Sequence, residues 1–173
     1  MKKLWLVMWV GMYLMVAGAR AVEPGQAAPD FKALSTAGRE VSLADFAGDW
    51  LVIYFYPKSF TPGCTAESCS LRDGYAGIQA LGARILGVSL DSLETQQKFK
   101  AEYNLPFDLL SDEHGEMAKA YDALGFGGFM AKRVTYIINP QGVVAKVLDE
   151  VKTGDHDTQV AAALREAQQA AQP

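Results

Sequence analysis

The sequence predicts a single α/β domain in which helices cover a central β-sheet. Three observations support this fold class: the chain has 173 residues, half of them are apolar, and strand-like segments alternate with helix-like ones. A chain of this length buries one substantial core but is short for two domains. The alternation predicts a largely parallel sheet, and a late hairpin should add antiparallel strands, which makes the sheet mixed.

Runs of β-forming residues predict the strands. Residues 50–56, "WLVIYFY", lack polar alternation, which is typical of a central strand that is covered on both faces. Two more buried strands are expected at residues 83–90 and 133–139. Shorter extended segments complete the sheet: two around a turn at residues 37–39, one at 106–110, and one at 143–151, after the turn "NPQG".

Four segments are predicted as helices: residues 64–80, 91–105, 112–124 and 155–171. The second and third have apolar residues at helical spacing, and the fourth is rich in Ala, Gln and Leu. Asp91 or Ser92 is suited to cap the second helix, because a short polar side chain there accepts a bond from a free backbone N–H. Gly125 is placed to end the third. The first follows a central strand directly, at the sheet edge where open α/β sheets place their active sites.

The N-terminus has the layout of a secretory signal. Basic residues precede the apolar run "LWLVMWVGMYLMV" at residues 4–16, and small residues follow at Ala19 and Ala21. We therefore expect a signal peptide at 1–21, a linker at 22–29 and the folded domain at 30–173. The run is shorter than the roughly 20 residues of a membrane span. Export, in a bacterium to the periplasm, is the prediction, and an uncleaved membrane anchor is the alternative.

Charge and composition exclude several classes of function. The net charge is −4 and no basic patch stands out, so no nucleic-acid partner is expected. The chain has only two histidines, His114 and His156, and both are expected on the surface. No metal site and no cofactor are predicted.

The two cysteines of the chain, Cys64 and Cys69, lie five positions apart at the start of the first predicted helix. In a regular helix this spacing separates their Cα atoms by about 8.7 Å. A disulfide needs roughly 4.4–6.8 Å. The pair therefore predicts two states, a reduced helical one and an oxidised one in which the first turns unwind. A purely structural disulfide that closes so short a loop would add little stability.

The two thiols should differ in reactivity. A free cysteine has a pKa of about 8.5 and is mostly protonated at neutral pH, whereas the thiolate is the nucleophile. Cys64 is expected in the first helical turn, where free N–H groups and the helix dipole favour an anion. Cys69 lies more than a turn further on. We therefore expect Cys64 to attack and Cys69 to respond.

The residues around Cys64 support a reactive site. Pro57 ends the strand, and Gly63 belongs to a tight Pro-Gly turn that lets backbone N–H groups face inward. The hydroxyl of Thr61 is suited to face the sulfur or a substrate oxygen. Glu67 follows Cys64 by about one helical turn, where its carboxylate could order an arginine.

These residues resemble the peroxiredoxins, thiol peroxidases with a thioredoxin-like fold. The pattern of Pro57, Thr61 and Cys64 matches the Pro-x-x-x-Thr-x-x-Cys motif of that family. The stretch "YPKSFTPGCTAESC" is similar to the bacterioferritin-comigratory-protein (PrxQ) branch, in which the second cysteine follows the first by five residues. The likeness extends over residues 29–151, which is nearly the whole predicted domain.

The resemblance implies a role for each residue. Cys64 would attack the peroxide and become a sulfenic acid, and Cys69 would condense with it into an intramolecular disulfide. Thr61 would bind peroxide, and Arg133 would stabilise the thiolate and the departing oxygen. Pro57 would shield the sulfur, Gly63 would contribute backbone donors, and Glu67 would support the site. A thioredoxin-like or other exported dithiol would reduce a monomeric enzyme.

Alternatives remain at this stage. The chain could be an exported thiol–disulfide oxidoreductase without peroxidase activity, although such proteins usually carry Cys-x-x-Cys. It could also be a binding module with a structural disulfide. The loop "FGGF" at residues 126–129 either lines the mouth of the pocket and favours organic hydroperoxides, or packs its two phenylalanines on the core.

Overall fold

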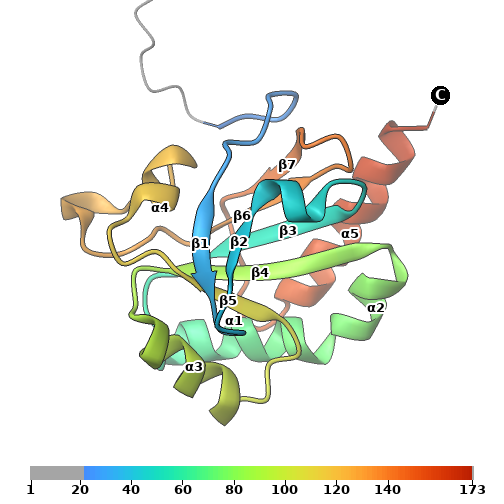
Figure 1. Ribbon diagram of the computed structural model, residues 1–173. Coiled ribbons are helices and arrows are strands. Elements are labelled where there is room, and N and C mark those ends of the chain that lie inside the picture. The colour runs from blue at the N-terminus through green and yellow to red at the C-terminus, as the bar shows by residue number, and fades with distance from the viewer. Residues whose placement is uncertain (1–21, 173) are drawn as a thin grey trace, which may run out of the picture.

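The computed structural model describes residues 22–172, and a seven-stranded mixed sheet forms its centre (Figure 1). The strands lie in the order β2-β1-β5-β4-β3-β6-β7. Their bounds are β1 Lys32–Ser35, β2 Glu40–Ser42, β3 Trp50–Phe55, β4 Ala83–Ser89, β5 Asp108–Ser111, β6 Val134–Ile138 and β7 Val144–Leu148. The predicted mixed sheet is thus confirmed.

The expectation that this sheet is largely parallel is wrong. Only the pairs β3–β4 and β4–β5 are parallel, and the other four neighbouring pairs are antiparallel. Parallel neighbours need a long crossover, and helices supply it only between these three strands. β6 instead returns beside β3 in the opposite direction. This pairing places the start of β6 next to the end of β3, where the loop that leads to Cys64 begins.

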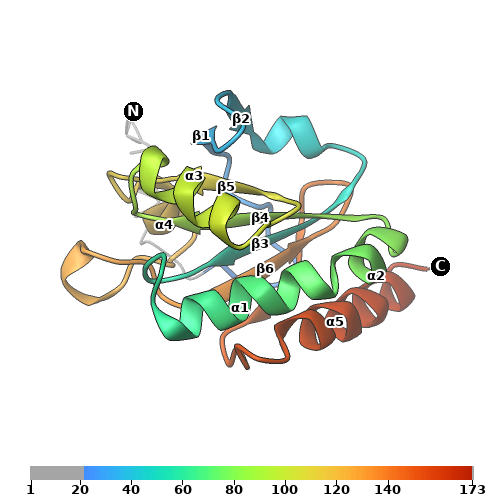
Figure 2. The same cartoon turned by 90° about the horizontal axis from the view of Figure 1, so that it is seen from below.

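Helices cover both faces of the sheet unequally. Their bounds are α1 Pro62–Asp73, α2 Tyr75–Ala80, α3 Leu93–Glu102, α4 Glu116–Ala120 and α5 His156–Ala170, with 3-10 turns η1 Leu43–Phe46 and η2 Phe126–Gly128. α1 and α5 lie side by side across one face, with α2 and α3 beside them (Figure 2). The short α4 and η1 cover the other face.

β3 links the two hydrophobic cores because successive side chains of a strand point to opposite faces. Leu51, Ile53 and Phe55 pack into the core under α4 and η1. Val52 and Tyr54 pack into the core under the long helices. All five side chains are buried, which fits the unbroken apolar run in the sequence. A strand held on both faces gives a rigid base for the loop that leaves its end.

Two helix predictions need correction. The helix expected at residues 64–80 is divided into α1 and α2 at Gly74. A Cβ at Gly74 would lie 2.4 Å from that of Asp157, so the start of α5 packs into the break. The helix expected at 112–124 is only the five residues of α4. Left-handed backbone at Gly115 and Asp122 interrupts the helical path on either side.

Residues 22–29, expected as a linker, are held against the domain. The N–H of Gly25 donates to the carbonyl of Val144 at 2.8 Å, and the N–H of Val144 donates to the carbonyl of Gln26 at 2.9 Å. Val22 is also buried. This segment therefore extends the folded unit by several residues beyond the predicted boundary at Asp30.

The predicted signal peptide at 1–21 lies outside the described residues. Within residues 22–172, no helix has both the length and the apolar character needed to cross a bilayer.

Candidate active site

Hydrogen bonds connect the loop between β3 and α1 to Asp91, just after the end of β4. The N–H of Ser59 donates to Asp91 Oδ2 at 2.7 Å, and Ser89 Oγ donates to the same oxygen at 2.8 Å. Phe60 adopts a left-handed φ of 66°, which is uncommon for a bulky residue, and its ring packs edge-on against Phe99. The loop is therefore held in one conformation just before the helix that carries both cysteines.

Helix α1 begins two residues before the predicted start at Cys64, so Pro62 and Gly63 belong to its first turn and not to a separate Pro-Gly turn. Pro62 is its first residue, a position that suits proline because its missing N–H would have no helical partner. The side chain of Thr61 does not cap the helix; its hydroxyl donates to the carbonyl of Lys58 at 2.9 Å. The Thr61 hydroxyl thus leaves the N–H groups of Gly63 and Cys64 uncapped at the start of α1. The Cys64 thiol itself is 1% exposed.

Arg133, directly before β6, reaches the sulfur of Cys64. Its Nη2 donates to Cys64 Sγ at 3.3 Å, and its Nη1 donates to Glu67 Oε2. Burial lowers the pKa of Arg133, but the charge of Glu67 and the Cys64 sulfur outweigh it, so the pKa lies above the ordinary value. A permanent positive charge therefore faces the sulfur. A Cβ at residue 63 would lie 3.3 Å from Arg133 Nη2, so the absence of a side chain at Gly63 leaves space for the guanidinium.

Glu67 is fully buried under this arginine and has a second neighbour that sequence reasoning missed. His156 Nδ1 lies 3.1 Å from Glu67 Oε1, and His156 is also 0% exposed. The prediction that His156 lies on the surface is wrong, because α5 packs its first residue under α1. One sequence pattern indicates that His156 is buried. His156, Val160 and Leu164 follow each other at intervals of four, which is the spacing of one buried helix face.

The remaining predicted site residues lie around this centre. Both cysteines are free, and Cys69 lies on α1 with Cys64, partly exposed. The helical reduced state predicted for the pair is thus the one observed. Pro57 is partly buried and follows β3. The Thr61 hydroxyl donates to the carbonyl of Lys58 and not to the Cys64 sulfur, and its contact with a substrate oxygen stays a prediction.

The loop at residues 126–129 does not pack on the core. Phe126 and Phe129 are 108% and 84% exposed, so that alternative is wrong. Neither ring lines the cavities that Arg133 borders, of about 680 and 420 Å³. A role for this loop at the pocket mouth stays a prediction.

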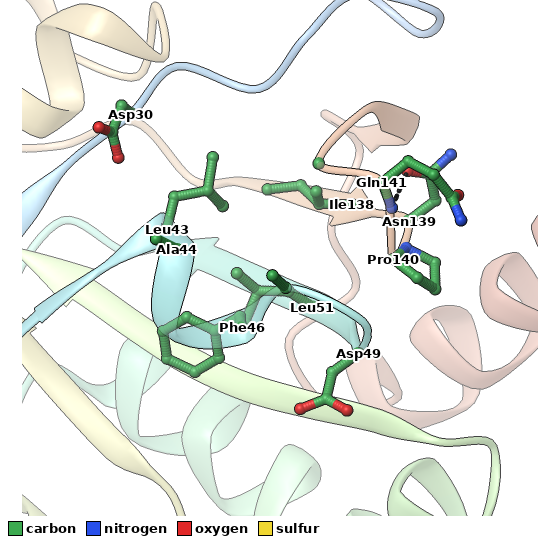
Figure 3. A pocket seen from close by; sticks show the side chains of 12 residues that line it. Asp30, Leu43, Ala44, Phe46, Asp49, Leu51, Ile138, Asn139, Pro140 and Gln141 are labelled. Carbon is green, nitrogen blue, oxygen red and sulfur yellow. Dashed lines mark hydrogen bonds between the residues drawn. The ribbon is translucent and has the colours of Figure 1, made fainter.

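A third cavity, of about 320 Å³, lies at the other end of β3 (Figure 3). η1 contributes Leu43 and Phe46, the start of β3 contributes Leu51, and β6 contributes Ile138. Cys64 follows the opposite end of the same strand, so this cavity is not part of the candidate site.

Comparisons with known proteins identify the family. Residues 24–147 match the model of the AhpC/TSA family. The chain is 40% identical to "Peroxiredoxin Bcp" of Bacillus subtilis over 151 residues, which cover 84% of this chain and 96% of that protein.

Solved structures agree as well. The crystal structure of peroxidoxin BcpB from Mycobacterium tuberculosis matches with a TM-score of 0.77 and 30% identity, covering 84% of this chain and 97% of that one. The bacterioferritin comigratory protein of Xanthomonas campestris, whose structure was described for its alkyl peroxide reduction activity, matches with a TM-score of 0.76 and 32% identity, covering 83% and 98%. The thioredoxin-like fold is thus confirmed, and the chain belongs to the AhpC/TSA family as a thiol peroxidase with relatives of the Bcp/PrxQ type.

Proposed function

We propose that this peroxidase reduces hydrogen peroxide and organic hydroperoxides through a sulfenic acid on Cys64 and an intramolecular disulfide with Cys69. The single observation that supports it best is the contact of Arg133 with both the Cys64 sulfur and the buried Glu67. It places a fixed positive charge beside the nucleophile, at a helix start that offers further N–H donors.

The first step needs no cofactor. The Cys64 thiolate attacks one peroxide oxygen, a sulfur–oxygen bond forms, and the O–O bond breaks. The other oxygen leaves as an alkoxide or hydroxide and takes up a proton to become alcohol or water. Arg133 and the first-turn N–H groups stabilise the negative charge on that oxygen, and such donors are worth about 10²–10³ in rate each.

The second step uses Cys69. Its sulfur attacks the Cys64 sulfenic acid, a disulfide forms and water leaves, which prevents further oxidation of Cys64. In a regular helix the two Cα atoms would be about 8.7 Å apart, so α1 has to unwind over residues 64–69 before the bond can close. A thioredoxin-like or other dithiol then reduces the disulfide by thiol exchange.

Stopped-flow measurements test both steps. Reduced protein should lose both thiols with one equivalent of hydrogen peroxide or cumene hydroperoxide. Cys64→Ser should not react, and Cys69→Ser should react once and stall as a sulfenic acid. Steady turnover with thioredoxin and its reductase tests the reductant. A protein that exchanges disulfides but ignores peroxide would overturn the proposal.

We also propose that the protein is a monomer and that it is exported and acts outside the cytosol. In a bacterium this compartment would be the periplasm. The charge-free run at residues 4–16 and the small residues Ala19 and Ala21 support export. Val22 is buried in the fold described for residues 22–172, and cleavage after Ala21 would retain this residue. N-terminal sequencing of protein from fractionated cells tests this, and an uncleaved, membrane-bound chain would favour an anchor instead. Light scattering, which gives the molar mass in solution, tests whether the protein is a monomer.

A further inference from the structure

A buried polar cluster lies beneath Arg133, where α1, β6 and α5 meet. Glu67 and His156 are both 0% exposed, and Thr135, also 0% exposed, lies behind the histidine. His156 Nδ1 is 3.1 Å from Glu67 Oε1, and His156 Nε2 is 3.0 Å from Thr135 Oγ1. The histidine therefore lies between a strand hydroxyl and the carboxylate that binds the catalytic arginine.

This arrangement divides the two oxygens of Glu67 between two partners. Oε2 accepts from Arg133, and Oε1 faces His156 and has no other protein partner within residues 22–172. The Nδ1–Oε1 contact lies within ion-pair distance but does not meet the geometry of a hydrogen bond. A carboxylate with no exposed surface is costly unless polar groups compensate it, and removal of His156 would take away the ring nitrogen that faces Oε1 at 3.1 Å.

The ring of His156 is itself fixed. Thr135 lies on β6, two residues after Arg133, and its Oγ1 is 3.0 Å from His156 Nε2. Tyr54 packs edge-on against the imidazole with ring centroids 6.2 Å apart. Because Thr135 and Tyr54 hold the ring from two strands, the ring can in turn hold the Glu67 carboxylate in place.

We propose that His156 is a positioning residue that holds Glu67, and through it acts on both steps of the cycle. It orients Arg133 toward Cys64, which speeds the attack on peroxide. It also stabilises the helical form of α1, which slows disulfide formation. Glu67 lies between Cys64 and Cys69 in sequence, so α1 cannot unwind between them without drawing this carboxylate away from Arg133 and His156. The inference rests on the proposed peroxidase mechanism.

The test compares His156→Leu with His156→Asn. Leucine fills the site without a donor, whereas asparagine places an amide N–H near the position of Nδ1. With His156→Leu the rate constant for hydrogen peroxide should fall by about 10- to 100-fold, the size of effect that a small misplacement of a reacting group produces. Disulfide formation after the first oxidation should become several-fold faster. His156→Asn should keep most of the wild-type behaviour in both steps.

Alkylation by iodoacetamide separates positioning from loss of the thiolate. Both reactions use the Cys64 thiolate, but only peroxide needs Arg133 aimed at a leaving oxygen. At a pH on the plateau of each rate profile, His156→Leu should change the alkylation rate by less than about twofold. Equal losses in the two reactions would overturn the proposal. The matched control is His114→Asn on the exposed second histidine, which should leave both rates unchanged.

A double-mutant cycle with Glu67→Gln tests the route of the effect. If His156 acts through Glu67, adding His156→Leu to Glu67→Gln should cause little further loss of peroxide rate. Full additivity would overturn the proposal. If His156→Leu does not fold, as judged by circular dichroism, Thr135→Val replaces it, because it removes the hydroxyl that fixes the ring. These outcomes differ from failure of the proposed function, in which the wild-type protein itself would not react with peroxide.

Discussion

Replacing Tyr54 by phenylalanine should make the Cys64–Cys69 disulfide harder to reduce. The Tyr54 hydroxyl and Ser68 Oγ form a hydrogen bond of 3.0 Å, and both residues are 0% exposed. Ser68 precedes Cys69 on α1, so the unwinding that joins the cysteines removes Ser68 from this bond. The bond therefore stabilises the reduced state and not the oxidised one.

The magnitude follows from the value of one buried hydrogen bond. Its loss costs about 1 kcal/mol in the reduced state. For a two-electron couple about 1.4 kcal/mol corresponds to 30 mV, so the reduction potential should become more negative by about 20 mV. The melting temperature of the reduced protein should fall by about 2–4 °C, while that of the oxidised protein should hardly change.

Redox titration in dithiothreitol buffers, with labelling of free thiols, measures the potential. The matched control is Tyr121→Phe. The ring of Tyr121 is buried in the core on the other face of the sheet, and its hydroxyl donates to the carbonyl of Pro29 at 2.7 Å. This bond exists in both redox states, so the control should lower both melting temperatures and leave the potential unchanged. The reasoning is refuted if Tyr54→Phe destabilises the reduced protein without a negative shift in potential.

Three further predictions concern the site and the core. Arg133→Lys loses the forked guanidinium that serves Cys64 and Glu67 together, and stopped flow should show a peroxide rate about 10²–10³-fold lower; a loss below tenfold would contradict this role. Gly63→Ala places a methyl group 3.3 Å from Arg133 Nη2, so the peroxide rate should fall several-fold with an unchanged melting temperature, and a full-rate variant would contradict the close packing. Burial raises the pKa of Tyr54 well above its ordinary value of 10.0 and that of Tyr136 to about 12. The stability that their neutral forms provide is therefore present below pH 10 and lost as the pH rises through the folded-state pKa values. Circular dichroism and tyrosinate absorbance should therefore change together above pH 10, and ionisation of these tyrosines in an intact fold would contradict the prediction.

Local sequence signals predicted the parts of the fold that local physics decides. The apolar run at β3 and the Ser92 cap of α3, whose Oγ accepts from the N–H of Thr95 at 3.3 Å, lie where expected. The division of α1 from α2 at Gly74 coincides with the close packing of Asp157, more than eighty positions away, and local sequence does not indicate that contact. The brevity of α4 likewise depends on the left-handed backbone at Gly115, which composition alone does not show.

The candidate site followed the same pattern. The motif around Cys64 predicted the nucleophile and its partner cysteine because those residues are close in sequence. The approach of Arg133 came from resemblance, and the structure brings it to 3.3 Å from the sulfur. The expectation that His156 is exposed is wrong, because α5 packs against α1. The spacing of His156, Val160 and Leu164 indicates a buried helix face, but the neighbour of His156 depends on packing between segments far apart in the sequence.

Mass analysis of the tryptic peptide at residues 59–72 tests the central claim most directly, because this peptide contains both cysteines. After one equivalent of peroxide, the wild-type peptide should lose two hydrogen atoms, and the peptide of Cys69→Ser should gain one oxygen on Cys64. The account is contradicted if the oxygen appears on Cys69 in Cys64→Ser at the wild-type rate, or if the wild-type peptide remains unchanged.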